Sequence, residues 1–395
     1  MQPSSSPRST VVLGGGPSGL ACARRLSAAG ERVVVLDKGR RPSGRLSTRR
    51  PRAFPHLALD VGAQFFTARD DDFLQQVDAW RRRSLVAEWS PRRSARLDDP
   101  AGPGRTPAAR WVGVPDMGTL VADLCNGLDV RFSTKVWRLR RAETAGREAR
   151  HPAAGRTPDP RTAARRPSTR CPRARRPRAW HLDVGPDVRG ASIDEVEIET
   201  WPEAFDRVVV ATPAPQARPL LEGHPFADRL RGVELAPCWA TMLIFDRPAE
   251  VVDAATGEPI DLIEADDGPL AWAADNASKP GRNPTSAWTL HAGPDWSLQH
   301  LDAEPAWIVE TMLNAFRQRV RWPADAQIVD RRAHRWRFAR VTTAAGAPFL
   351  WDAEAGLGVA GDGCLAPRVE AAWISGHRLA EAMLAEAMLD TPDPS

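Results

Sequence analysis

Two glycine-rich stretches near opposite ends of the chain have the residue types and spacing of a nucleotide-binding site. The first follows an apolar run at 10–13 and opens a helical pattern at 17–29. In such a strand–turn–helix unit, the first glycine allows a tight turn, the second lets the backbone approach a pyrophosphate, and the third lets the helix pack on the strand. The helix N-terminus then faces the phosphates. Against the alternative of a plain glycine-rich turn, we predict a diphosphate site made by Gly14, Gly16, Pro17, Ser18 and Gly19.

An acidic residue closes the second strand of the same unit. Asp37 follows the apolar run 32–36, where a carboxylate can accept both ribose hydroxyls of an adenosine and disfavours a 2′-phosphate. The alternative is a solvated charge at a strand end. We predict that Asp37 and the adjacent Lys38 take part in cofactor binding. The second glycine-rich stretch, 357–362, also runs from an apolar strand into a helix, so the domain that holds the nucleotide must bring the two ends of the chain together.

The residues after Asp37 resemble a known flavoprotein motif. The stretch 43–48, Ser-Gly-Arg-Leu-Ser-Thr, is similar to the GGRxxT sequence of the amine-oxidase and renalase branch of FAD-dependent flavoproteins, with Ser43 in place of the first glycine. The resemblance implies that Arg45 lies beside the diphosphate, where a guanidinium can contact two phosphate oxygens at once. The alternative for Arg45 is a solvated basic loop.

The stretch 60–70 carries a more specific resemblance. Its sequence, DVGAQFFTARD, resembles the DxGAQ(Y/F)FTARD segment of bacterial renalase-like proteins. Further segments that resemble this family are 111–115, 211–217, 278–282, 334–340 and 369–376. Together they touch nearly the whole chain outside 141–200. The chain is therefore identified as similar to the bacterial renalase-like FAD-dependent oxidoreductases.

The resemblance implies an α/β fold in which a Rossmann-like FAD-binding domain is interleaved with a smaller α+β substrate domain, as in two-domain flavoproteins of the amine-oxidase and renalase type. The span 141–200 is expected to be an Arg/Pro-rich insertion, disordered in part. We expect the FAD-binding domain at 1–60, 110–140, 201–216 and 335–395, and the substrate or cap domain at 61–109 and 217–334. Hydrophobic periodicity predicts helices at 17–29, 71–90, 117–127, 303–320 and 365–390, and strands at 10–13, 32–36, 129–132, 205–211, 239–245, 270–273 and 287–291.

Three further residues are assigned to the cofactor by the resemblance. Asp362 would bind the ribityl or pyrophosphate region, and Val369 belongs to the closing helix, whose N-terminus would point at the flavin N1–C2=O edge. Val136 would contact the adenine through its backbone, although a core valine explains it equally well. Cys364 could tether FAD, as a cysteine does in some amine oxidases, but a small buried thiol is the ordinary case. We therefore expect non-covalent FAD.

The residues on the substrate side are harder to infer. His291 and Trp296 lie in the strand-rich part that should cover the flavin, and Gln64 follows a Gly-Ala turn expected to pass it. We take these three as catalytic candidates, with a purely structural role as the alternative for each. Lys279 is the lysine that could stand near flavin N5, as in many amine oxidases. Its Ser-Lys-Pro-Gly context indicates an exposed loop.

The resemblance implies hydride transfer from a small electron-rich substrate to flavin N5, followed by reoxidation by O2 with release of H2O2. The implied substrates are isomeric 2- or 6-dihydro forms of NAD(P), which are strong hydride donors and need stacking and orientation more than a dedicated base. An FAD-dependent amine oxidase or desaturase of the same fold is the first alternative. A flavin-binding protein with degraded activity is the second.

Composition limits the other classes of function. The span 141–178 holds twelve arginines and three acidic residues but no aromatic residue for stacking bases, and the remaining chain is mildly acidic, so no nucleic-acid partner is expected. The five cysteines are scattered without CxxC spacing, which indicates reduced thiols and no metal site. No apolar run is long enough to cross a membrane. With a polar N-terminus that leads straight into a strand, these features favour a cytoplasmic protein. The expected partners are a small-molecule substrate and O2, with the oligomeric state left open.

Overall fold

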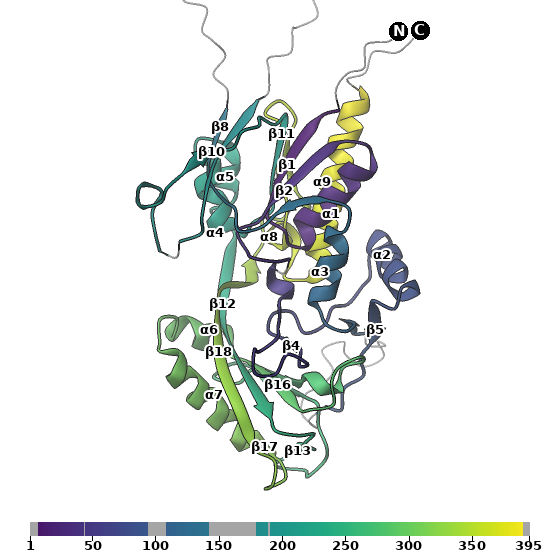
Figure 1. The fold of residues 1–395 in the computed structure, drawn as a ribbon, viewed down its shortest axis with the longest axis vertical. Coiled ribbons are helices and arrows are strands. Elements are labelled where there is room, and N and C mark those ends of the chain that lie inside the picture. Colours follow the sequence, from purple (N-terminus) through teal and green to yellow (C-terminus); the bar gives the residue numbers. More distant parts are fainter. Residues whose placement is uncertain (1–6, 43, 94–107, 142–178, 189, 390–395) are drawn as a thin grey trace, which may run out of the picture.

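The computed structural model describes residues 7–42, 44–93, 108–141, 179–188 and 190–389. Two layers of structure are stacked along the long axis of the molecule (Figure 1). One is built on a mostly parallel sheet that contains both the first and the last strands of the chain. The other is built on an antiparallel sheet from the middle of the chain. The predicted basic segment is 141–178, and its residues 142–178 lie outside the described residues.

A six-stranded sheet forms the centre of the first layer, in the order β19-β20-β11-β1-β2-β7. The strands β20, β11, β1, β2 and β7 run parallel, and β19 is antiparallel to β20. The inner strands are runs of valine and leucine because both faces of a parallel sheet are covered. The strands are β1 (Ser9–Leu13), β2 (Arg32–Leu36), β7 (Asp129–Arg131), β11 (Arg207–Val210), β19 (Leu350–Asp352) and β20 (Leu357–Val359).

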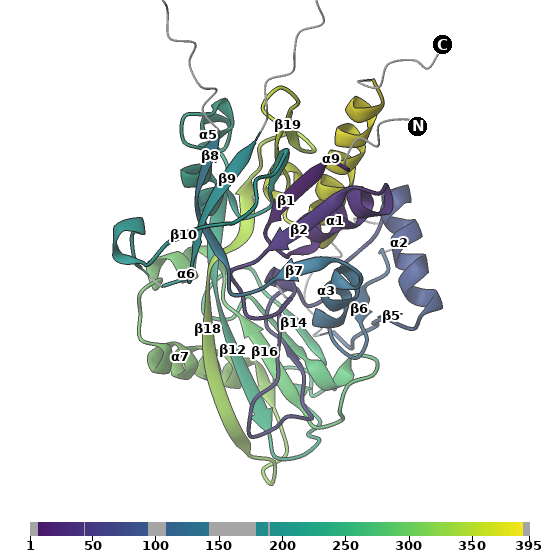
Figure 2. The ribbon, with the colours of Figure 1, turned by 45° about the horizontal axis from the view of Figure 1, so that its top comes forward.

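Different elements cover the two faces of this sheet (Figure 2). On one face, Val12 and Val35 pack with the helices α1, α2, α3 and α9. On the other face, Val11 and Val34 pack with α4, α5 and a small antiparallel sheet of β8, β9 and β10. The helices are α1 (Pro17–Ala28), α2 (Asp71–Arg82), α3 (Gly118–Cys125), α4 (Ala214–Ala217), α5 (Pro225–Arg229) and α9 (Val369–Leu389); the small sheet comprises β8 (Lys135–Arg141), β9 (Trp180–Gly185) and β10 (Glu199–Thr200).

The second layer, called the cap, is a five-stranded antiparallel sheet in the order β14-β15-β16-β12-β18. One face packs against α7 (Pro305–Arg319) through a core that contains Trp288 and Phe316. The opposite face packs on Leu57, Leu59 and Val61 of the first layer. The strands are β12 (Glu234–Phe245), β14 (Leu262–Glu264), β15 (Trp272–Asp275), β16 (Ala287–His291) and β18 (Ile328–Thr343).

The expected interleaving of chain segments is visible in this layout. Segments from 9–36, 129–141, 207–210 and 350–389 build the first layer, and the cap sheet is drawn from 234–343. The domain boundaries themselves stay a prediction, and the one expected at 334/335 falls inside the continuous strand β18. Within the predicted insertion 141–200, β9 and β10 are ordered strands, and β9 pairs with both β8 and β10.

Two predicted helices are shorter than expected. The helix predicted at 71–90 ends at Arg82, where Arg83 and the positive φ of Ser84 (56°) turn the chain into β5 (Val86–Glu88). The helix predicted at 365–390 is preceded by a separate short helix, α8 (Asp362–Leu365), and begins at Val369. Among the described residues, no helix combines the length and apolar character that crossing a membrane requires.

Candidate functional site

The glycine-rich turn between β1 and α1 has the geometry expected of a diphosphate-binding loop. Gly14 has a φ of 113°, and its N–H donates to the carbonyl of Leu36 at 2.9 Å. A Cβ on Gly19 would lie 2.0 Å from the carbonyl oxygen of Gly14, because α1 packs directly on the turn. These two glycines are therefore required by the chain's own backbone packing.

Gly16 differs from the other two glycines of the motif. A Cβ at this position would meet nothing within 4 Å, so the space beside Gly16 at the N-terminus of α1 is open. Pro17 and Ser18 follow as the first residues of the helix. The hydroxyls of Ser18 and of Thr212, which lies beside Gly14, are buried and have no hydrogen-bond partner. The open space at the N-terminus of α1, with one unpaired hydroxyl on that helix and another beside the glycine turn, fits a bound diphosphate.

Asp37 stands at the end of β2 and lies against this loop. Its carboxylate accepts hydrogen bonds from the backbone N–H groups of Gly15 and Gly39, both at 2.6 Å. These bonds fix the carboxylate beside the glycine turn, where the sequence predicted a ribose contact. Lys38 points elsewhere and forms an ion pair with Asp187 at 3.2 Å. Its predicted role at the cofactor stays a prediction.

Arg45 and Asp362 join the two glycine-rich stretches of the sequence. The guanidinium donates to both carboxylate oxygens of Asp362, at 2.5 and 2.6 Å, and also lies 3.4 Å from the carbonyl of Ala339 on β18. Gly44 brings this segment to the glycine loop, since a Cβ there would lie 3.4 Å from Cα of Gly16. The Arg45 side chain is about one-third exposed, so it remains accessible to a ligand at the loop.

Two of the predicted cofactor residues have side chains that pack against apolar neighbours, Val136 within the core and Val369 partly buried beside it. The Val136 side chain is buried with Val184 of β9 in the core beneath β1 and β2. Val369 opens α9 and lines a small apolar void with Pro17 and Leu46. Contacts between a cofactor and the backbone of these two residues therefore stay a prediction.

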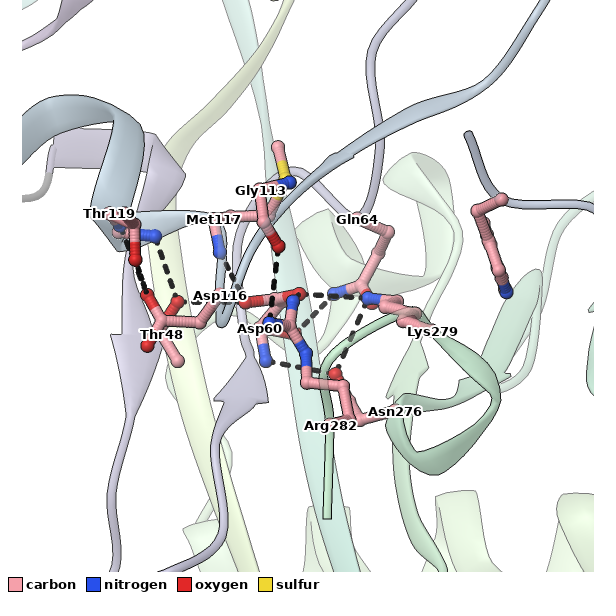
Figure 3. Close-up of polar contacts among 12 residues, drawn as sticks. Thr48, Asp60, Gln64, Gly113, Asp116, Met117, Thr119, Asn276, Lys279 and Arg282 are labelled. Atoms are coloured by element: carbon pink, nitrogen blue, oxygen red, sulfur yellow. Dashed lines mark hydrogen bonds and ion pairs between the residues drawn. The ribbon is translucent and has the colours of Figure 1, made fainter. Parts of the chain in front are cut away.

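A buried polar cluster lies where the cap meets the first layer (Figure 3). The Lys279 ammonium donates to Asp60 at 3.0 Å, to Gln64 at 2.9 Å and to Asn276 at 3.3 Å. The expectation that Lys279 lies in an exposed loop is therefore wrong: its residue is 2% exposed. The loop after β15 turns inward because Asp60 supplies the opposite charge.

Gln64, a predicted catalytic residue, belongs to this cluster. Its amide nitrogen donates to the carbonyls of Asp60 and Gly62, and its amide oxygen accepts from Lys279. Its described hydrogen bonds all go to neighbouring protein groups, and two of them hold the backbone at Asp60 and Gly62. The side chain therefore supports the turn at 61–64. Gly62 is required in this turn, because a Cβ there would lie 1.9 Å from the carbonyl oxygen of Arg45. The turn at 61–64 is thus packed directly against the backbone of Arg45.

His291 lies beside the same turn. Its Nε2 is 3.1 Å from the carbonyl oxygen of Val61, to which Trp336 also donates at 3.0 Å. Because a carbonyl only accepts, Nε2 carries a hydrogen. The ring stacks on Trp272 with centroids 5.6 Å apart and planes at 29°. Burial lowers the pKa of His291 to about 4, and the nearby Lys279 charge adds to this effect.

A second histidine lies further along β18. His334 contacts Trp336 edge to face, with ring centroids 4.6 Å apart. Burial lowers the pKa of His334 to about 4, with a further contribution from Arg49. The cap face that meets the first layer therefore carries two imidazoles that are neutral at pH 7 and two tryptophans. Such a surface can stack on a planar ring and offer it hydrogen-bond acceptors.

Trp296 is not part of this arrangement. It lies on α6 (Pro294–Gln299), where it stacks with His300 at 4.4 Å and with Trp307 at 6.0 Å. It packs against the core on the α7 face of the cap sheet. His291 faces the opposite way, toward Val61, so the structure separates the two predicted catalytic residues.

Sequence reasoning missed Asp60 and Arg282 as charged groups of the junction and Trp272 and Trp336 as its aromatic residues. Both charged residues stand within segments that resemble the renalase-like family, at 60–70 and 278–282. An aspartate that directly follows an apolar strand residue was a usable signal for Asp60. Trp336 likewise stands within such a segment, at 334–340, whereas nothing local marks Trp272 among the fifteen tryptophans in the chain.

Comparisons with known proteins agree with this architecture. A family model described as an NAD(P)-binding Rossmann-like domain matches residues 12–79. The (S)-6-hydroxynicotine oxidase of Paenarthrobacter nicotinovorans is 42% identical over 55 residues, which are 14% of this chain and 13% of that enzyme. A structure from Exiguobacterium sp. 255-15, assigned as a protoporphyrinogen oxidase, superposes with a TM-score of 0.63 at 12% identity and covers 97% of this chain and 99% of its own.

A putrescine oxidase solved with putrescine superposes with a TM-score of 0.62 at 11% identity, covering 96% of this chain and 99% of its own. The predicted fold class, an α/β fold with a Rossmann-like domain and the two-domain architecture of amine-oxidase-type flavoproteins, is thereby confirmed. The low identities establish the fold alone, and the hydroxynicotine oxidase is matched over only about an eighth of its length. The resemblance to the renalase-like branch stays a prediction.

Proposed function

We propose that this protein is an FAD-dependent oxidoreductase that oxidises a small, electron-rich substrate. The cofactor assignment rests on the open cradle at Gly16, the unpaired hydroxyls of Ser18 and Thr212, and Arg45 beside the loop. The oxidase fold of the solved relatives supports it. Bound FAD supplies a ring that accepts a hydride from the substrate and passes the electrons to O2.

We further propose that the substrate is a planar heteroaromatic hydride donor, with isomeric 2- or 6-dihydro-NAD(P) as the first candidate. The observation that carries this choice is the neutral His291 stacked on Trp272 and held at the Val61 turn. The two rings would orient a dihydropyridine by stacking, and the surrounding apolar residues would exclude water. A substrate that is already a strong hydride donor requires no separate base.

Oxidation of an amine is the alternative with support of its own. The solved putrescine oxidase was crystallised with an amine, and the locally similar enzyme is a hydroxynicotine oxidase. Neutral imidazoles could accept a proton from an amine at the same surface. A flavin-binding protein with degraded activity is the remaining possibility, and it predicts a bound flavin that no donor reduces.

Anaerobic stopped-flow spectroscopy separates these functions. The purified protein is mixed in turn with 2- and 6-dihydro-NAD(P), ordinary NADH and simple amines, while the flavin band near about 450 nm is followed. Rapid bleaching of the flavin band by the ring isomers alone supports the proposal. Bleaching by amines would instead indicate an amine oxidase. A bound flavin that none of them reduces leaves only the binding function. The absence of any flavin band refutes the cofactor assignment. Release of FAD by acid precipitation tests whether it is non-covalent.

A further inference from the structure

One carboxylate connects three separate parts of the chain at the junction of the cap with the first layer (Figure 3). Asp60 accepts hydrogen bonds at Oδ1 from the hydroxyl of Thr48 at 2.7 Å and from the N–H of Met117 at 3.1 Å. At Oδ2 it accepts from Lys279 at 3.0 Å and from Arg282 at 2.6 Å. Thr48 and Met117 belong to the first layer, whereas Lys279 and Arg282 come from the cap.

The ionic groups at this junction are shielded from water. The side chains of Asp60 and Lys279 are 0% exposed, and that of Arg282 is 2% exposed. Burial alone would raise the pKa of Asp60, but the Lys279 and Arg282 charges hold it below its ordinary value. Burial lowers the pKa of Lys279, whereas its three oxygen acceptors favour the charged form. We call Asp60, Lys279 and Arg282 the junction cluster.

The backbone beside the junction cluster holds two residues of the cap. The N–H of Asp60 donates to the side-chain oxygen of Asn276 at 3.0 Å, which fixes the peptide between Leu59 and Asp60, one residue before Val61. The Val61 carbonyl then accepts from His291 on β16 and from Trp336 on β18. Any shift of Asp60 therefore moves the acceptor on which both aromatic side chains depend.

The junction cluster also acts on His291 through its charge. Two cations face the Asp60 carboxylate in a buried place, and Asp275 is a further carboxylate whose charge acts on Lys279. Lys279 is the charged group that acts on His291, and it opposes protonation of the imidazole. With Nε2–H donated to Val61, a neutral His291 retains a free lone pair on Nδ1.

We propose that Asp60, Lys279 and Arg282 are positioning residues, which hold the cap on the first layer and so fix His291 and Trp336 at the Val61 turn. The consequence for catalysis rests on the function proposed above, because His291 is there assigned to the substrate. The junction itself needs no bound cofactor. It gives the segments 60–70 and 278–282 one shared role, in which each supplies the partners of the other.

Titration of His291 tests this proposal without depending on activity. The protein holds eight histidines, so selective labelling gives few imidazole signals, and His291→Gln identifies the signal of interest. In the wild-type protein we expect His291 to remain neutral well below its ordinary pKa of 6.5. Lys279→Met should raise the midpoint by about one pH unit, a tenfold gain in proton affinity, and Lys279→Arg should restore the wild-type value. Lys135→Met is the matched control, since Lys135 pairs with Asp187 on the opposite side of the first layer.

Flavin content and flavin reduction provide the second readout. Because the glycine loop is untouched, Lys279→Met should retain bound FAD while its rate of reduction by the substrate falls about tenfold or more. A wild-type His291 that titrates at its ordinary value overturns the proposal, and this measurement requires no variant to fold. A folded Lys279→Met protein with unchanged His291 titration and unchanged flavin reduction also overturns it. If the wild-type protein contained no flavin, the proposed function would fail, yet the His291 titration would still decide whether the junction cluster acts as described.

Discussion

The glycine loop and the junction cluster are built in opposite ways. The loop is made mainly of backbone from residues 14–19, and its key space is one that the chain leaves open at Gly16. The junction is made of charged side chains from residues 60, 279 and 282, and it is filled by their own contacts. The proposed cofactor end of the site is therefore a short local motif, whereas the proposed substrate end depends on how the two layers meet.

The largest effect is expected from the tightest contact of the loop. In Gly19→Ala, the new Cβ would lie 2.0 Å from the carbonyl oxygen of Gly14, and α1 cannot move away because it packs between β1 and α9. We expect a loss of more than about 4 kcal/mol in the free energy of unfolding, measured by denaturant titration. A variant with near wild-type stability would show that the loop is less rigid than described.

Gly16→Ala sharpens the comparison within the same loop. The added methyl meets no protein atom within 4 Å, so the free energy of unfolding should change by no more than about 1 kcal/mol. The methyl instead enters the space assigned to the diphosphate, and we expect the affinity for FAD to fall by about tenfold or more. Isothermal titration of the apoprotein measures this affinity. Unchanged FAD binding would remove Gly16 from the cofactor site.

At the junction, Asp60→Ala should be nearly as damaging as the change at Gly19. Removal of the carboxylate leaves Lys279 and Arg282 buried without their counter-charge, and breaking a buried ion pair in this way costs about 3–5 kcal/mol. The control is Asp302→Ala, whose carboxylate also accepts from two arginines but is 76% exposed. That change should cost about 1 kcal/mol or less, and equal losses in the two variants would contradict a special role for burial.

Arg45 tests the link between the two glycine-rich stretches. In Arg45→Ala the contact with Asp362 is lost, and the diphosphate loses its cationic partner, so we expect mostly apoprotein after purification. Arg45→Lys keeps the charge without the forked geometry and should bind FAD with intermediate affinity. The ratio of flavin to protein absorbance measures both. A full flavin spectrum in the alanine variant would exclude Arg45 from the cofactor site.

The stability of the protein should also depend on pH below about 6.5. His291 and His334 have folded pKa values of about 4, below the ordinary 6.5, so the unfolded chain binds their protons more readily. Stability should therefore fall as pH decreases from 6.5 toward 4, by up to about 1.4 kcal/mol per pH unit for each histidine. Burial raises the pKa of Asp275 to about 6, which partly offsets this fall below pH 6. His334→Gln should flatten the curve measured by denaturant titration, and a flat wild-type curve would contradict the burial of both rings.

The contrast between the two regions explains which predictions held. The βαβ unit of 9–36 and the closing helix followed from the sequence, because valine-rich strands, glycine spacing and helical periodicity are local properties. The fold class followed from the resemblance to known flavoproteins that the motifs carry. The helix at 71–90 was predicted too long because the turn at Ser84 depends on a backbone conformation that its side chain does not reveal. The burial of Lys279 was missed because its neighbours in the sequence, a serine and a proline, do not reveal that Asp60 supplies a buried carboxylate partner.

The sequence by itself determined the glycine-rich loop, the acidic residue after β2 and the alternation of segments between two layers. Each depends on neighbours within a few residues or on repeated apolar patterns. Only the tertiary structure decided that Lys279 meets Asp60, that His291 faces Val61, and that Trp296 lies on the other side of the cap sheet. The first two outcomes depend on residues more than two hundred positions apart, and the third depends on which face of the cap sheet a side chain meets. The charges of Asp60 and Lys279 become buried only once the two layers have packed.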